Sequence, residues 1–219
     1  MPSNGRTIKW IVFDVGETLL DETRQWEALA DRLGVPRFTF FDTLGALIAQ
    51  RRHHREVFKI LAPDFDYLAD VAAPRGPSAA TAWTAGDLYP DARPALAALK
   101  AAGYKLGIVG NQPAWIEPVI ASWEVAADLI ASSASWGIEK PDVRFYKRLA
   151  KEAGAAPERI AYVGDRIDND IVPARAAGLH TIFIRRGPWG FVHADWPEAA
   201  LASARIESLG ELPALLTRL

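Results

Sequence analysis

The sequence predicts an α/β protein in which a parallel β-sheet with helices on both faces carries an all-helical insert. From Asp91 onward, apolar strand-like runs alternate regularly with helical patterns, the order that produces right-handed crossovers and a parallel sheet. Residues 20–87, by contrast, show helical periodicities followed by a Pro-, Gly- and Ala-rich stretch. We therefore expect a core domain formed by residues 1–19 and 88–219 and a helical domain formed by residues 20–87.

Composition excludes several classes of protein. Half of the 219 residues are apolar and 24% are charged, as in ordinary globular proteins. The formal net charge of -2 gives no sign of a nucleic-acid partner. The absence of cysteine excludes disulfides, thiolate catalysis and thiolate metal sites. Charged residues interrupt the first thirty positions, and no apolar run approaches the roughly 20 residues that span a bilayer. We expect a cytoplasmic protein with no membrane partner.

The first elements are a strand and the helices of the insert. The apolar run Trp10–Phe13 predicts a buried strand. Helical spacing of apolar residues then predicts helices over 23–33 and 41–61, with a short third helix over 66–71. The basic run at 51–55 falls inside the second of these helices, where we expect a solvated helix face. The alternative is that this run contacts an anionic substrate.

The rest of the core follows as alternating helices and strands. We expect helices over 92–102, 113–123, 141–154 and 171–177, strands over 104–110, 127–132, 159–164 and 180–184, and a C-terminal packing helix over 209–219. The strand over 180–184 completes the predicted sheet, and residues 185–190 are expected to form a surface loop.

Polar side chains follow these strands at the points where the strands end. Asp14 follows the first strand, Asn111 the second, and Lys140 comes shortly after the third. Asp165 and Asp170 follow the fourth strand. Because parallel strands bring their carboxyl ends to one edge of the sheet, we expect the three acids and the lysine to converge there.

Such a cluster has a specific chemistry. Several carboxylates close together require a cation to stay ionised, and oxygen ligands without His or Cys suit Mg²⁺. A lysine in the same place can neutralise a transferring phosphoryl group, and an aspartate can serve as the nucleophile. The residues therefore indicate Mg²⁺-assisted phosphoryl transfer, with metal binding without chemistry as the alternative.

The four segments FDVGETL, IVGN, KPD and VGDRIDND resemble, in order, the four motifs of the haloacid dehalogenase-like (HAD) hydrolase superfamily. The helical insert resembles that family's type 1 cap. The resemblance extends from about residue 8 to residue 190. It implies a Rossmann-like parallel core with an inserted helical cap domain.

The resemblance also implies roles for individual residues. Asp14 would be the nucleophile and a Mg²⁺ ligand, and Lys140 would hold both Asp14 and the phosphoryl group. Asp165 would bind Mg²⁺, while Asp170 would complete the acidic cluster or orient the lysine and the metal's waters. The backbone carbonyl of Gly16 would be a further metal ligand.

The phosphoryl group is expected to contact Thr18, Gly110, Asn111 and Lys140. Two of the motif positions depart from the family pattern. Phosphatases of this family usually have a second Asp, the general acid, where this chain has Gly16, and Ser or Thr where it has Gly110. Asn111 could donate an N–H in place of the missing hydroxyl. Glu17, one residue beyond Gly16, is expected to point elsewhere.

These features predict a Mg²⁺-dependent phosphatase that hydrolyses a small-molecule phosphate ester through an aspartyl-phosphate on Asp14. Three alternatives stay open: a dehalogenase-type hydrolase, a phosphotransferase, and a catalytically weak HAD-fold binding protein. Gly16 and Gly110 favour the last of these, whereas the cost of burying four charged side chains argues against it. The sequence indicates neither the identity of the substrate nor the oligomeric state.

Overall fold

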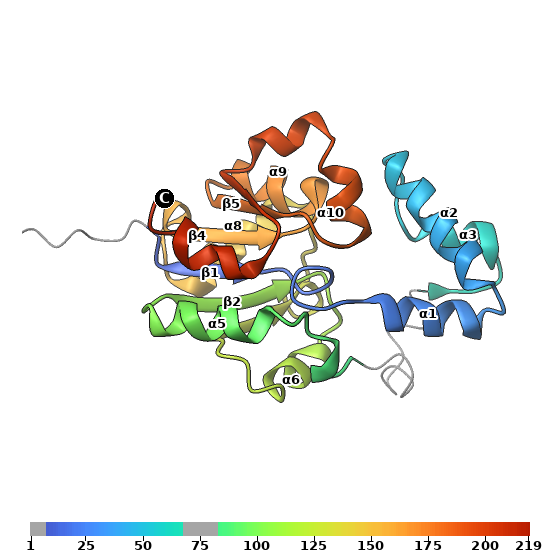
Figure 1. The fold of residues 1–219 in the computed structure, drawn as a ribbon, viewed down its shortest axis with the longest axis horizontal. Helices are drawn as coiled ribbons and strands as arrows, with labels where there is room; N and C mark the ends of the chain where they lie inside the picture. The colour runs from blue at the N-terminus through green and yellow to red at the C-terminus, as the bar shows by residue number, and fades with distance from the viewer. Residues whose placement is uncertain (1–7, 68–82) are drawn as a thin grey trace, which may run out of the picture. The chain divides into compact units, whose positions relative to one another are not determined.

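The computed structural model of this chain describes residues 8–67 and 83–219. The chain divides into two compact units, coloured by residue number in Figure 1. One unit comprises Met1–Leu20 and Leu88–Leu219, and the other comprises Asp21–Asp87.

The first unit is built on one sheet with the strand order β3-β2-β1-β4-β5-β6. Its strands are β1 (Trp10–Phe13), β2 (Lys105–Gly110), β3 (Leu129–Ser132), β4 (Ile160–Gly164), β5 (His180–Ile184) and β6 (Ala204–Ile206). Every pairing in the sheet is parallel. All four residues of β1 are buried because the strand is central and covered on both faces.

Helices of the first unit lie on both faces of this sheet (Figure 1). They are α5 (Ala92–Ala101), α6 (Ile116–Ala121), α7 (Ser133–Trp136), α8 (Val143–Ala153), α9 (Val172–Ala176), α10 (Gly187–His193) and α11 (Leu212–Leu215). Short stretches of 3₁₀-helix occur at η2 (Pro157–Arg159), η4 (Pro197–Leu201) and η5 (Leu209–Glu211), and a π-helical turn, η3, spans Ile167–Ile171.

Helix α8 packs most of the core on one face of the sheet. Its apolar residues Phe145, Tyr146 and Leu149 are fully buried and cluster with Val12 of β1 and Tyr162 of β4. The helix begins at Val143, two residues after the predicted start, because the Asp142 side chain accepts a hydrogen bond from the Arg144 N–H and caps the helix. Its end at Gly154, with φ of 59°, is the predicted one.

The predicted α/β core with a parallel sheet is confirmed, but several of its details were wrong. A sixth strand, β6, lies beyond the strand over 180–184 that was expected to complete the sheet. Residues 187–193 form α10 instead of a surface loop. The helix predicted over 171–177 begins earlier, as the π-helical turn η3.

The second unit contains α1 (Thr23–Arg32), α2 (Arg37–Ala49), α3 (Glu56–Leu61) and the 3₁₀ turn η1 (Ala85–Asp87). The single helix predicted over 41–61 is therefore wrong. The chain leaves the helical conformation after Ala49, and Arg51 adopts a left-handed φ of 58°, which no helix interior tolerates. The short helix predicted over 66–71 lies largely outside the described residues.

Aromatic packing holds the second unit together. The ring of Trp26 lies 6.0 Å from Phe40 and 6.5 Å from Phe58, and Phe58 stacks on Tyr67 at 4.6 Å. This cluster joins the three helices in one small core. Where the unit's chain ends meet, Arg24 pairs with Asp87 at 2.6 Å.

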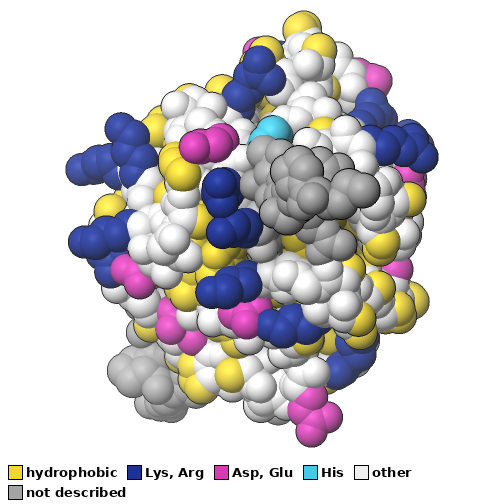
Figure 2. All heavy atoms as spheres, turned by 90° about the vertical axis from the view of Figure 1, so that its left-hand side faces the viewer, with side chains coloured by type: hydrophobic (Ala, Val, Ile, Leu, Met, Phe, Trp, Pro, Cys, Tyr) yellow, Lys and Arg dark blue, Asp and Glu magenta, His cyan; other side chains and the backbone are white. Residues whose placement is uncertain are grey.

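The surface carries charges of both signs. Figure 2 shows one face on which Lys and Arg side chains gather in a band, with Asp and Glu among them. This mixture agrees with the net charge of -2. Within residues 8–67 and 83–219, no helix is long and apolar enough to cross a membrane.

Candidate active site

The site is built at the carboxyl edge of the sheet, where Asp14 directly follows β1. The Asp14 N–H donates to Val163 O of the neighbouring strand β4 at 2.9 Å, which continues the sheet pairing up to the nucleophile candidate. Asp14 is 7% exposed. A nearly buried carboxylate at a strand end needs a partner of opposite charge.

Lys140 supplies that partner from the loop between α7 and α8. Its ammonium nitrogen lies 2.8 Å from Asp14 Oδ1 and 2.7 Å from Asp170 Oδ1, and it donates to the Tyr162 hydroxyl at 3.2 Å. Burial alone would lower the pKa of Lys140, but the charges of Asp14 and Asp170 raise it above its usual value. Lys140 therefore stays positively charged at the carboxyl edge of the sheet.

Asp165 and Asp170 complete the acidic cluster. Asp165 follows β4 directly, and η3 brings Asp170 back over the end of the same strand, against Gly164, where a Cβ would collide with the Asp170 carboxylate. One ligand oxygen from each of Asp14, Asp165 and Asp170 lies within 4.8 Å of the others. The predicted convergence of Lys140 with these three acids is thus present in the geometry.

Asp165 and Asp170 are buried, so their ionised forms need a cation nearby. Burial raises the pKa of Asp165 well above its usual value, with the charges of Asp170 and Asp14 adding to the effect. Burial, opposed by Lys140, raises the pKa of Asp170 to about 6. Oδ2 of Asp165 is buried and accepts no hydrogen bond within the described part of the chain. A hard divalent ion such as Mg²⁺ fits this set of oxygen donors.

Asp170 differs from the other two acids in its partners. Its Oδ1 meets Lys140, and its Oδ2 accepts a hydrogen bond from the Arg166 N–H at 3.0 Å. Both oxygens thus have protein partners, which supports the orienting alternative for this residue. Asp168 stands apart from the cluster, because its carboxylate pairs with Arg166 at 2.7 Å.

Gly110 lies beside Asp14 at the end of β2, and Asn111 directly follows it. A Cβ placed on Gly110 would lie 2.5 Å from Asp14 Oδ1, so the carboxylate occupies the space that a Ser or Thr side chain would need. The side chain of Asn111 hydrogen bonds at both ends to the backbone of Lys140.

The loop that follows Asp14 contains the other predicted residues. Thr18 is fully buried, and its hydroxyl donates to Asp165 Oδ1 at 3.4 Å. Gly16 presents only backbone there. Glu17 is 4% exposed with a φ of 51°, and its carboxylate accepts a 2.6 Å hydrogen bond from the Tyr89 hydroxyl.

Tyr162 is a site residue that the sequence analysis missed. It lies in β4 with its hydroxyl between the Lys140 ammonium and the Val109 carbonyl, to which it donates at 2.8 Å. Burial raises its pKa well above the usual value, so the hydroxyl keeps its proton. The signal available in the sequence was a tyrosine hydroxyl within an apolar strand that ends shortly before Asp165.

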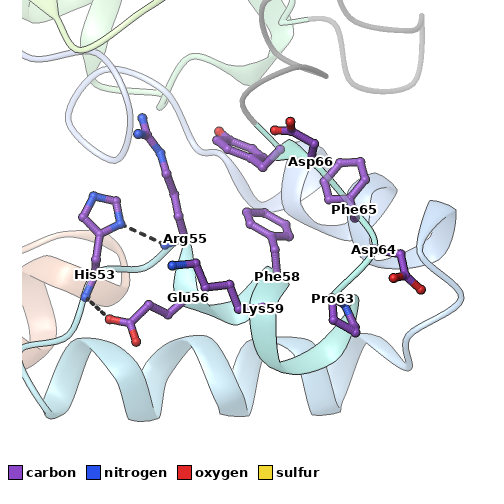
Figure 3. A pocket seen from close by; sticks show the side chains of 10 residues that line it. His53, Arg55, Glu56, Phe58, Lys59, Pro63, Asp64, Phe65 and Asp66 are labelled. Atoms are coloured by element: carbon purple, nitrogen blue, oxygen red, sulfur yellow. Dashed lines mark hydrogen bonds between the residues drawn. The ribbon is translucent and has the colours of Figure 1, made fainter.

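The basic run of the second unit forms the turn between α2 and α3 and not a helix face. Arg52 pairs with Glu56 at 2.6 Å, and the His53 ring accepts from the Arg55 N–H at 3.2 Å. His53, Arg55 and Phe58 are among the residues that line a hollow of about 580 Å³ within this unit. Figure 3 shows these side chains. Arg52, His53 and Arg55 thus have partners within the run or in the first turn of α3.

Comparison with known proteins identifies the family. A family model described as haloacid dehalogenase-like hydrolase matches residues 8–178. The chain therefore belongs to the haloacid dehalogenase-like hydrolase family, as the four motifs predicted.

Two relatives and one solved structure illustrate what this chain is similar to. A glyceraldehyde 3-phosphate phosphatase of Methanopyrus kandleri is 37% identical over 109 residues, which cover 46% of this chain and 45% of the relative. The chain thus spans about half the length of this relative. The plasmid phosphoglycolate phosphatase of Cupriavidus necator is 31% identical over 72% of this chain and 68% of its own length.

The HAD hydrolase YfnB of Bacillus subtilis, solved bound to magnesium, has a TM-score of 0.67 at 18% identity, with 95% of this chain and 98% of that chain covered. At this identity the structural likeness shows the shared fold alone. It agrees with the parallel sheet and the helical insertion described above.

Proposed function

We propose that this protein is a Mg²⁺-dependent phosphatase that hydrolyses a small phosphorylated metabolite through an aspartyl-phosphate on Asp14. The observation that carries the proposal is the placement of Asp14, which lies 2.8 Å from the buried Lys140 ammonium. An oxygen of Asp14 also lies within 4.8 Å of an oxygen of each of two further carboxylates, close enough to share one metal ion. The names of the two relatives, both phosphatases of small phosphorylated metabolites, support the same class of reaction.

In this proposal Asp14, the Gly16 carbonyl and Asp165 would hold Mg²⁺, and Asp170 would complete the acidic cluster and orient Lys140. The bound ion would neutralise charge on the phosphoryl group. An oxygen of Asp14 attacks phosphorus, and the bond from phosphorus to the leaving oxygen breaks. Water then cleaves the aspartyl-phosphate, which releases inorganic phosphate and restores the carboxylate.

Lys140 acts as an electrostatic stabiliser in both steps. Its ammonium group orients the Asp14 carboxylate in the resting protein and would compensate the negative charge of the phosphoryl oxygens during transfer. Its raised pKa keeps it charged across the physiological range. Thr18 and the backbone around Gly110 complete the proposed phosphoryl site.

The missing carboxylate at Gly16 predicts the kind of ester that reacts best. A general acid typically contributes about 10²–10⁴-fold to the rate when the leaving group is a poor one. The Glu17 carboxylate is engaged by Tyr89. We therefore expect leaving groups that depart without full protonation to be favoured.

The test is turnover of an aryl phosphate with and without Mg²⁺, for wild type and for Asp14→Asn. We expect turnover that requires Mg²⁺ and is lost in the variant. Metal-independent turnover of a 2-haloacid, with no release of phosphate from the ester, would replace this proposal by the dehalogenase alternative. Mg²⁺ binding without turnover of either compound would favour a binding protein.

A further inference from the structure

We infer that Asn111 is a positioning residue that fixes Lys140 in the site, and not a ligand of the phosphoryl group. This inference rests on the role proposed above for Lys140. It reassigns a side chain that the sequence predicts to contact the substrate.

The first observation is that the Asn111 amide is engaged at both ends by one residue. Its Oδ1 accepts from the Lys140 N–H at 2.7 Å, and its Nδ2 donates to the Lys140 carbonyl at 2.8 Å. Only this orientation of the amide matches donors with acceptors. A side chain held in this way cannot turn toward a phosphoryl oxygen without giving up a bond to Lys140.

The second observation is that Lys140 lies outside regular structure. It belongs to the segment between α7 and α8, so no helical or strand pairing fixes its backbone. A lysine side chain is long and flexible, and the position of its ammonium group depends on where its backbone starts. The 2.8 Å contact with Asp14 therefore requires an anchor at Lys140 itself.

The third observation is that Asn111 is well placed to be that anchor. It directly follows β2, whose residue Ile108 pairs in register with Phe13 of β1. Asp14 is the next residue after Phe13. The amide of Asn111 thus links the segment that contains Lys140 to the end of β2. Because β2 pairs with β1, which Asp14 follows, Asp14 and Lys140 are positioned by the same two strands.

The first experiment measures kcat and KM of Asn111→Ala for an aryl phosphate. Displacing a catalytic group by about an ångström can cost about 10²-fold, so we expect kcat to fall by about 10- to 100-fold with KM little changed. Gln112→Ala removes the next amide side chain along the chain and is the matched control, with both constants unchanged. A raised KM and a raised inhibition constant for inorganic phosphate, at unchanged kcat, would overturn the inference.

A double-mutant cycle with Lys140→Ala separates the two roles. If Asn111 acts only through Lys140, its removal from the Lys140→Ala protein changes turnover by less than about twofold, because contacting residues that act as a unit are not additive. Effects that multiply would mean an independent contact with the substrate. If Asn111→Ala does not fold, the isosteric Asn111→Asp, which sets an oxygen against the Lys140 carbonyl, replaces it in the cycle.

A measurement without substrate distinguishes failure of this inference from failure of the proposed function. Lys140 is 4% exposed, so an amine-acylating reagent followed by mass spectrometry should leave it unmodified while it labels the exposed Lys151. In Asn111→Ala we expect labelling of Lys140 to rise several-fold, with Lys151 unchanged. Continued protection of Lys140 would overturn the positioning role, whether or not the protein turns over a phosphate ester.

Discussion

The Lys140 ammonium group bridges Asp14 and Asp170, at 2.8 Å and 2.7 Å, in a space that is almost closed to solvent. Removing this cation would leave two buried carboxylates facing each other. Breaking a buried ion pair on one side typically costs about 3–5 kcal/mol, and losing one electrostatic stabiliser costs about 10²–10³-fold in kcat.

We predict both losses for Lys140→Ala, measured by denaturant unfolding and by turnover of an aryl phosphate. Lys151→Ala, on the exposed face of α8, is the matched control and should change neither quantity. Wild-type turnover in Lys140→Ala would remove this residue from the proposed mechanism.

Restoring the family's usual residue at Gly110 should harm this protein. A Cβ there would meet Asp14 Oδ1 at 2.5 Å and Val15 Cγ2 at 3.2 Å, so Gly110→Ser must push the carboxylate away from its place. We predict a fall in kcat of at least about tenfold. Gly45→Ala, in α2 with no atom within 4 Å of the added carbon, should leave kcat unchanged. A gain in turnover for Gly110→Ser would contradict the prediction.

The stabilising effect of Mg²⁺ should grow with pH. The pKa of Asp170 is raised from 3.8 to about 6 by burial. A carboxyl group with a raised folded pKa contributes its stability below the unfolded value, near 3.8, and loses it as pH rises through 6. In the metal-free protein this group therefore destabilises the fold above pH 6, where its ionised carboxylate adds to the negative charge that attracts Mg²⁺.

Thermal unfolding with Mg²⁺ or with EDTA, at a pH below and a pH above this pKa, checks the effect. Saturation at about 100 times the Kd adds about 2.7 kcal/mol, or roughly 5–10 °C in Tm for a chain of this size. We expect that shift at the higher pH and a much smaller one at the lower pH. Equal shifts would mean that these carboxylates do not hold the ion.

Glu17 should act through its shape and its hydrogen bond and not as the missing general acid. A Gln side chain can still accept the hydrogen bond from Tyr89, so Glu17→Gln should keep turnover of an alkyl phosphate within about tenfold. Loss of a general acid would instead cost about 10²–10⁴-fold. Glu17→Ala leaves the Tyr89 hydroxyl without this acceptor, and we expect it to lose about 1–3 kcal/mol of stability.

The leaving-group preference should follow from the same feature. We predict that wild type hydrolyses aryl phosphates faster than alkyl phosphates by about 10²-fold or more, since Gly16 supplies no acid to protonate a poor leaving group. Parallel kcat/KM measurements on the two esters check this. Similar values would mean that another residue protonates the leaving oxygen.

The sequence predicted the core of the fold because its strands are continuous apolar runs with clear ends. Asp14 and Asp165 could be placed at one edge of the sheet for that reason. Strand β6 was missed because three residues, only one of them fully buried, give no periodic signal. The break after Ala49 was missed because Arg51, and not glycine, adopts the left-handed conformation there.

The partners of polar side chains could not be predicted from the sequence. The amide of Asn111 can bond a ligand or a backbone, and its partner, Lys140, is 29 residues away. Tyr162 looks like any aromatic residue of a buried strand until its hydroxyl is seen beside Lys140. Such pairings depend on tertiary structure.

The most direct test of the proposed chemistry is to look for the phosphoryl group on Asp14. The protein is quenched in acid during turnover of an aryl phosphate with Mg²⁺, digested, and analysed by mass spectrometry. We predict a phosphoryl group on the peptide that contains Asp14, and neither this modification nor turnover in Asp14→Asn. Undiminished turnover by Asp14→Asn, or a phosphoryl group carried by a different residue, would contradict the aspartyl-phosphate mechanism.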